Sequence, residues 1–140
     1  MTERELLTRL YLISGHYDFL VIFKREYNEQ NWGEYYHRNK VIVLYVNDEN
    51  GEQYDDETLV RVSCHELAHH IQFHHIEGYK PVKGEEHDTV FKQEFAKFLK
   101  LYYNGRVPQS TLDFIKGEGF ANEPNRKKKR KLPSRSTDVC

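Results

Sequence analysis

The amino-acid sequence predicts an α+β domain in which a small, mostly antiparallel sheet of three strands packs on helices. The first observation is length: 140 residues can bury a real core in one domain but are too few for two typical domains. The second is the order of the expected elements, a helix, three strands and then further helices, which points to an α+β fold. The third is a histidine-rich stretch, CHELAHHIQFHH at 64–75, which lies inside one of these helices.

The N-terminal half is expected to contain one helix and the three strands. Thr2 and Glu5 form a T-x-x-E capping box, in which each side chain can bind a free backbone N–H at the start of a helix. The segments at 18–26, 33–39 and 40–46 are rich in apolar, aromatic and β-branched residues, which favour strands. A tight turn joins the last two segments, so we expect antiparallel pairing between them.

Helices are expected to fill most of the second half. Asp55 or Asp56 can cap a long helix from about Glu57 to Ile76, and Gly78 is a suitable end signal. Aromatic residues at helical spacing predict a further helix, which a short one follows. These two helices are expected at about 88–103 and 110–115.

Charge divides the chain into an acidic body and a basic C-terminal segment. Residues 126–140 hold seven of the 21 Lys and Arg but one of the 22 Asp and Glu, which leaves the body a formal charge of −7. We therefore assign 1–116 to the folded domain and 117–140 to a basic, disordered tail. The run RKKKRK at 126–131 can contact nucleic acid phosphates, act as a nuclear import signal in a eukaryotic host, or simply keep the tail solvated.

Composition argues against membrane and disulfide-stabilised classes. The longest apolar runs are far too short to span a bilayer, and the N-terminus lacks the apolar core of a secretion signal. The two cysteines, Cys64 and Cys140, do not suggest a disulfide framework or a zinc knuckle. We expect an intracellular protein, cytoplasmic or, in a eukaryotic host, nuclear, with no membrane partner.

The histidine-rich helix contains a motif with specific chemistry. His65, Glu66 and His69 match H-E-x-x-H, and residues four apart on a helix stand on one face, so both imidazoles can bind one ion. Zinc accepts imidazole nitrogens, and the glutamate beside it can take a proton from water and deliver it to a leaving amine. A histidine on a helix face is usually only solvated or hydrogen-bonded, but the helical context and apolar flanks favour one bound Zn²⁺ ion.

The third protein ligand has four candidates. His75 has the spacing of the metzincin motif, but position 72 holds Gln where that motif needs a glycine turn, and on a continuing helix His75 faces away. His87 follows a loop long enough to reverse the chain and opens the next helix. Glu94, two turns further on, would complete a gluzincin-type site, and the pair Glu85–Glu86 lies in the loop between the helices.

Two stretches together resemble the SprT-like metalloprotease family, which includes the Spartan proteases. HELAH at 65–69 matches the motif helix, and HDTVF at 87–91 matches the family's pattern of histidine, small residue, two variable residues and phenylalanine. Asp88 stands where the family commonly has glycine. The resemblance covers roughly 5–105 and implies a zincin-like metalloprotease core. By this resemblance His65, His69 and His87 bind zinc, Glu66 is the catalytic base, and Phe91 packs behind the third ligand.

The resemblance implies a zinc metalloendopeptidase that hydrolyses peptide bonds in protein substrates. Spartan-type members cleave proteins crosslinked to DNA and bind DNA through regions outside the protease domain. The basic run at 126–131 is compatible with such a separate DNA-binding region. One alternative is a small gluzincin that cleaves a regulatory protein, with Glu94 as third ligand. Another is a catalytically idle zinc-binding adaptor for nucleic acid or protein, although a purely structural site has no need of Glu66.

Several neighbouring residues have open roles at this stage. Asp88 can cap its helix or orient a ligand histidine. Glu94 can also orient a ligand histidine, or it can lie on a solvated helix face. The strand with Tyr35 and Tyr36 can offer an edge to a peptide substrate, although ordinary sheet packing explains these tyrosines better. The loop at 79–86 and the C-terminal segment are candidate covers for the cleft. The sequence does not select a donor for the oxyanion.

Overall fold

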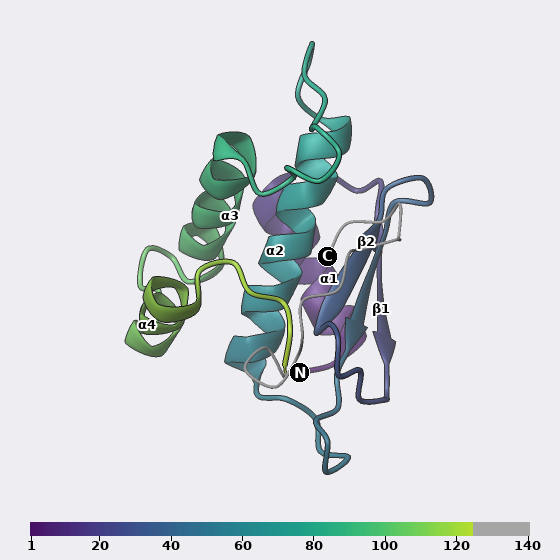
Figure 1. The fold of residues 1–140 in the computed structure, drawn as a ribbon, viewed down its shortest axis with the longest axis vertical. Coiled ribbons are helices and arrows are strands. Elements are labelled where there is room, and N and C mark those ends of the chain that lie inside the picture. Colours follow the sequence, from purple (N-terminus) through teal and green to yellow (C-terminus); the bar gives the residue numbers. More distant parts are fainter. Residues whose placement is uncertain (125–140) are drawn as a thin grey trace.

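The computed structural model describes residues 1–124, which form four helices and three strands (Figure 1). The elements agree in order and type with those predicted, and their ends differ by a few residues. In chain order they are α1 (Glu3–Ser14), β1 (Leu20–Lys24), β2 (Gly33–Tyr36), β3 (Val41–Tyr45), α2 (Asp56–His74), α3 (Thr89–Tyr102) and α4 (Gln109–Glu118).

The sheet is mixed, so the prediction of a mostly antiparallel sheet is wrong. The strand order is β1-β3-β2: β2 pairs antiparallel with β3, as the tight turn between them requires, whereas β1 pairs parallel with β3. The connection at 25–32 carries the chain past β3 to the opposite edge of the sheet, two strand spacings or about 10 Å away. Strand composition predicts where strands lie but not which strands become neighbours.

Helix α2 is the centre of the molecule. Fourteen of its 19 residues are buried, because it packs on β2 and β3 along one side and on α3 along the other (Figure 1). A helix enclosed on all sides is expected to be apolar all round. Seven of the buried α2 residues are nevertheless polar or charged: Arg61, Ser63, His65, Glu66, His69, His70 and Gln72. Such buried polar groups need hydrogen-bond partners inside the protein.

The helix caps agree with the sequence prediction. Thr2 Oγ1 accepts a hydrogen bond from the Glu5 N–H at 3.1 Å, and Asp55 Oδ1 accepts one from the Thr58 N–H at 2.8 Å. At the other end, α2 stops at His74 and the chain turns through Gly78 in the left-handed conformation, at φ 71°.

Helix α2 packs tightly on the sheet at Gly33, the first residue of β2. A Cβ at this position would lie 2.8 Å from Val62 Cγ1 and 3.0 Å from Leu44 Cδ2, closer than carbon atoms normally pack. Because Gly33 has no side chain, β2 can pack closely against α2 at Val62, just before the H-E-x-x-H motif.

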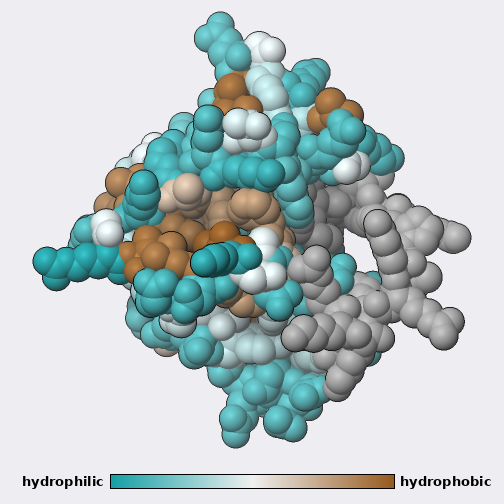
Figure 2. Space-filling view, turned by 60° about the vertical axis from the view of Figure 1, so that its left-hand side comes forward, coloured by the Kyte–Doolittle hydropathy of each residue, from teal (hydrophilic) through white to brown (hydrophobic). Residues whose placement is uncertain are grey.

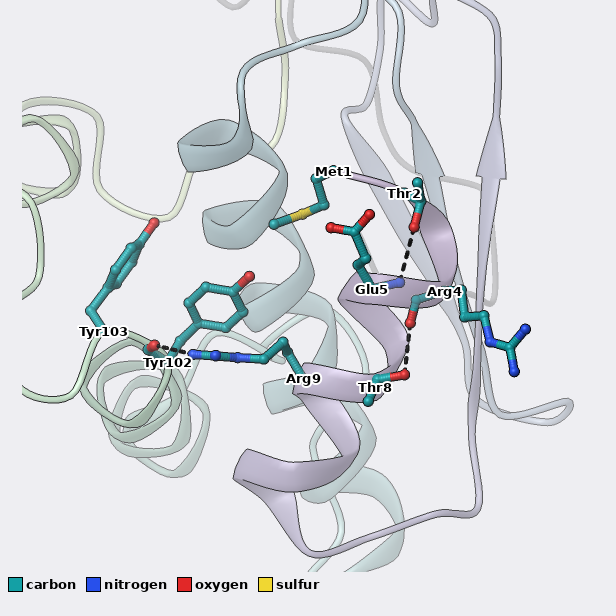
Figure 3. Close-up of a pocket in the computed structure, with 8 residues that line it drawn as sticks. All are labelled: Met1, Thr2, Arg4, Glu5, Thr8, Arg9, Tyr102 and Tyr103. Atoms are coloured by element: carbon teal, nitrogen blue, oxygen red, sulfur yellow. Dashed lines mark hydrogen bonds between the residues drawn. The ribbon is translucent and has the colours of Figure 1, made fainter.

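The surface away from the sheet has two further features. On the side where α3 and α4 lie, apolar side chains gather within a hydrophilic surround (Figure 2). Leu101 on α3 and Leu112 on α4 are each 45% exposed. A pocket of about 680 Å³ opens between α1 and the end of α3 (Figure 3). In it, Arg9 Nη2 donates to the Tyr102 carbonyl at 2.8 Å, and no histidine lines its wall.

The predicted C-terminal tail begins too early at 117. Helix α4 continues to Glu118, and Asn122 is only 7% exposed, so the chain remains packed on the domain beyond the predicted boundary. The basic run at 126–131 lies outside the described residues. Within residues 1–124, every helix is too short or too polar to cross a membrane.

Candidate metal centre

Three histidines converge between α2 and the start of α3. His65 and His69 project from α2, and His87 lies two residues before α3; one ring nitrogen of each lies within 4.8 Å of the others. The Nε2 atoms of His65 and His87 are 3.2 Å apart. Two ligands of a tetrahedral zinc stand about 3.3 Å apart when each bond is about 2.05 Å, so the arrangement fits such an ion.

The other proposed third ligands are placed elsewhere. Glu94 Oε2 pairs with Lys97 Nζ at 2.5 Å on α3, and both carboxylate oxygens of Glu86 accept from the Gly84 N–H. His75 bonds to Asp18 beyond the end of α2, which agrees with the prediction that it faces away from His69. Of the candidates weighed, the structure brings only His87 into the group with His65 and His69.

Gln72 fixes the ring of His69. Its Nε2 donates to the Glu86 carbonyl at 2.7 Å and to Asp88 Oδ1 at 3.0 Å, so its Oε1 faces His69 Nδ1 at 2.9 Å. An amide oxygen only accepts, and His69 Nδ1 must therefore carry the proton. The lone pair is then on His69 Nε2, the form that a metal requires.

Asp88 combines the two roles that the sequence left open. Its Oδ1 accepts from the Phe91 N–H at 3.0 Å and so caps α3. The same carboxylate accepts from Gln72, and Tyr79 donates its hydroxyl to the other oxygen. Through Gln72 the cap of α3 is thereby joined to the ring of His69.

Phe91 forms an apolar wall behind the histidines. It is fully buried and stacks on His69, with ring centroids 4.4 Å apart at 21°, and meets His65 edge-on at 4.8 Å. Its ring centroid also lies 4.7 Å from that of His87. The packing role that the family resemblance implies for Phe91 thus has a counterpart in the structure.

Glu66 is fully buried beside these histidines on α2. Burial raises the pKa of Glu66 well above its ordinary value, the carboxylate of Glu34 raises it further, and a hydrogen bond from Asn122 opposes the shift. The Asn122 Nδ2 donor lies 2.9 Å from Glu66 Oε2. A carboxyl group with a raised pKa is suited to accept a proton near neutral pH.

The segment after α4 crosses this region, and sequence reasoning missed its key residue. Asn122 Nδ2 also donates to the Gly33 carbonyl at 2.7 Å, and the Asn122 carbonyl accepts from the Trp32 N–H at 3.0 Å. Phe120 packs edge-on against Phe91, with ring centroids 5.4 Å apart. An asparagine in a polar stretch gives no sequence signal, although the C-terminal segment was a predicted cover.

Strand β2 forms an edge of the sheet, as the order β1-β3-β2 requires. Tyr35 is fully buried and donates its hydroxyl toward His70 Nδ1 at 2.6 Å, which confirms an ordinary packing role. Tyr36 and Tyr45 donate to the two carboxylate oxygens of Glu34 at 3.1 Å and 2.5 Å.

No family model matches the chain, and no curated protein matches it. Its structure is similar to the crystal structure of the metallopeptidase zymogen of Pyrococcus abyssi abylysin, with a TM-score of 0.53 and 18% sequence identity. The match covers 87% of this chain and 99% of that one. At this identity the likeness concerns the fold, which is therefore similar to that of a metallopeptidase zymogen.

Proposed function

We propose that this protein is a zinc-dependent metallopeptidase that hydrolyses peptide bonds in protein substrates. The observation that carries the proposal is the convergence of ring nitrogens from His65, His69 and His87 within 4.8 Å of one another, with the buried Glu66 next to His65 on the same helix. The likeness of the fold to a metallopeptidase zymogen supports it.

The three histidines would hold the ion. Catalytic zinc sites use three protein ligands, whereas structural sites use four, so a three-histidine set favours catalysis. A zinc ion held there supplies Lewis acidity for the peptide carbonyl and lowers the pKa of water. Two residues of the chain prepare the ligands: Gln72 sets the tautomer of His69, and Phe91 packs against the rings of all three histidines.

Glu66 is the proposed general base. Its carboxylate would take a proton from the attacking water and return it to the amine that leaves when the peptide bond breaks. Burial raises the pKa of the Glu66 carboxyl group above its ordinary value, which makes the carboxylate a stronger base for this proton transfer. These roles follow the residue assignments that the family resemblance implies.

The substrate would lie where the segment at 120–122 now lies. An extended peptide can pair with the edge of β2 that faces away from β3, where Gly33 now presents its carbonyl to Asn122. Because the same Asn122 bonds to Glu66, this segment must move before a peptide reaches the carboxylate. Proteolysis would then depend on how readily Phe120 and Asn122 leave their contacts.

We further propose a SprT-like substrate choice, namely proteins associated with DNA. The support is the resemblance of HELAH and HDTVF to that family and the basic run at 126–131 beside an acidic body. A histone incubated with the zinc-loaded protein, with and without single-stranded DNA, tests this choice. DNA-stimulated cleavage that disappears when 126–131 is neutralised supports it, and equal cleavage without DNA overturns it.

A further inference from the structure

A second histidine cluster lies at the opposite end of α2 from its N-cap. His16 and Asp18 belong to the connection between α1 and β1, and His75 follows the last residue of α2. One ligand atom of each lies within 4.8 Å of the other two. His75 Nε2 is 2.9 Å from Asp18 Oδ2, and the rings of His16 and His75 stack with centroids 3.7 Å apart. The cluster shares no residue with the three-histidine group.

The carboxylate of Asp18 is held in place from inside the molecule. His70 Nε2 lies 2.9 Å from Asp18 Oδ1, and Tyr35 Oη lies 2.6 Å from His70 Nδ1. A carboxylate only accepts, so the His70 nitrogen that faces Asp18 carries a proton, and the other ring nitrogen can accept from the Tyr35 hydroxyl. Carboxylates that bind metals are oriented by such buried partners.

One cation already lies near the carboxylate. Lys40 Nζ is 3.6 Å from Asp18 Oδ2, with 42% of the lysine side chain exposed. An exposed pair of this kind contributes little to stability, and the flexible lysine can turn into solvent. Lys40 therefore does not prevent a more strongly bound ion from taking the same oxygen.

We propose that His16, Asp18 and His75 bind a second zinc ion. Two imidazole nitrogens and one carboxylate oxygen are a donor set that zinc accepts, and the fourth position would be filled by water. The ion would join the connection after α1 to the end of the helix that carries the H-E-x-x-H motif. Since it binds the folded chain and not the unfolded one, it would stabilise the fold by mass action.

The number of zinc ions per chain tests this proposal. Tag-free protein, stripped of metal, would be titrated with zinc against a chromophoric chelator, and the bound metal counted after dialysis. We expect two equivalents in the wild type and one in Asp18→Asn, His16→Ala and His75→Ala. His74→Ala is the matched control, because His74 lies beside His75 but bonds to the His37 carbonyl, and it should keep two. The second equivalent should raise the melting temperature of wild type and His74→Ala only.

His69→Ala separates this proposal from the proposed function. It should lose one zinc ion and keep the one that Asp18→Asn loses. If Asp18→Asn and His16→Ala, both shown to be folded by circular dichroism, bind as much zinc as the wild type, the second site is refuted. If the wild type binds a single ion that His69→Ala removes, the second site is refuted and the proposed function stands. If the single ion is lost in Asp18→Asn but kept in His69→Ala, the second site stands and the catalytic site fails.

Discussion

Gln72 presents its Oε1 to the Nδ1 of His69 at a distance of 2.9 Å, one turn along the same helix. The amide can do so because its Nε2 is occupied by the Glu86 carbonyl and by the cap residue Asp88. The helix that carries two histidines, the loop that follows it and the start of α3 are therefore joined by one buried side chain. Through this amide, the position of His87 is tied to the orientation of His69.

Gln72→Met is expected to weaken zinc binding at the three-histidine site. Methionine has a similar length but accepts no strong hydrogen bond, so His69 would lose the partner that fixes its tautomer. Loss of such a partner typically costs 10–100-fold in metal affinity, and we expect a change of about this size. Chelator competition measures it, with the exposed Gln53→Met as control. Unchanged affinity in folded Gln72→Met would show that the amide does not prepare the ligand.

Asn122→Ala is expected to increase peptidase activity. The substitution removes the hydrogen bonds to Glu66 and to the Gly33 carbonyl, so the segment at 120–122 should leave the site more easily. A hydrogen bond to a charged group contributes about 1.5–3 kcal/mol, which corresponds to a rise of roughly tenfold or more in kcat/KM. The exposed Asn50→Ala serves as control. A fall in activity would instead assign Asn122 a supporting role in catalysis.

Gly33→Ala is expected to destabilise the protein by about 1–3 kcal/mol, because the added methyl group would overlap Val62 where β2 meets α2. Urea denaturation measures the free energy of unfolding. Gly117→Ala is the matched control: it lies within α4 with no other atom within 4 Å of an added Cβ, so it should stabilise by about 0.5–1 kcal/mol. Equal effects of the two substitutions would refute the close packing of β2 on α2.

The metal-free protein should lose stability through Glu66 as the pH rises. Burial raises the pKa of Glu66 in the folded state above its value in the unfolded chain. Between these two pKa values, the folded protein holds a proton that the unfolded chain has released. The free energy of unfolding then falls as the pH rises from about 4.5 toward the folded-state pKa. Glu66→Gln removes this term, so its stability relative to the wild type should increase as the pH rises above about 5 in the presence of chelator. The exposed Glu49→Gln serves as control. If the free energies of unfolding of the wild type and of Glu66→Gln change with pH in the same way, the raised pKa of Glu66 is contradicted.

Local sequence signals predicted much of this molecule. The capping box at Thr2, the cap at Asp55 and the motif at His65 depend on spacings of three or four residues, which a helix turns directly into contacts. His87 was singled out by the pattern that it forms with Phe91. These interactions involve neighbours in the chain, so the residues themselves identify the geometry.

Contacts between distant segments could not be predicted in the same way. The pairing of β1 with β3 depends on the path of the connection at 25–32, and no residue in it specifies which edge is taken. Asn122 meets Glu66 across 56 positions, and Asp18 meets His75 across 57. His75 was correctly expected to face away from His69, but its partners lie in the loop after α1, where the sequence gives no pairing signal.

The most direct test of the central claim is cleavage of a protein substrate by the zinc-loaded wild type and by Glu66→Gln. A histone and an unfolded casein would be incubated with each protein after its zinc content has been measured. We predict that the wild type produces fragments and that Glu66→Gln, with the same zinc content, is slower by at least about 100-fold. Cleavage at the same rate in both proteins, or none by zinc-loaded wild type and Asn122→Ala, would contradict a peptidase that uses Glu66 as its base.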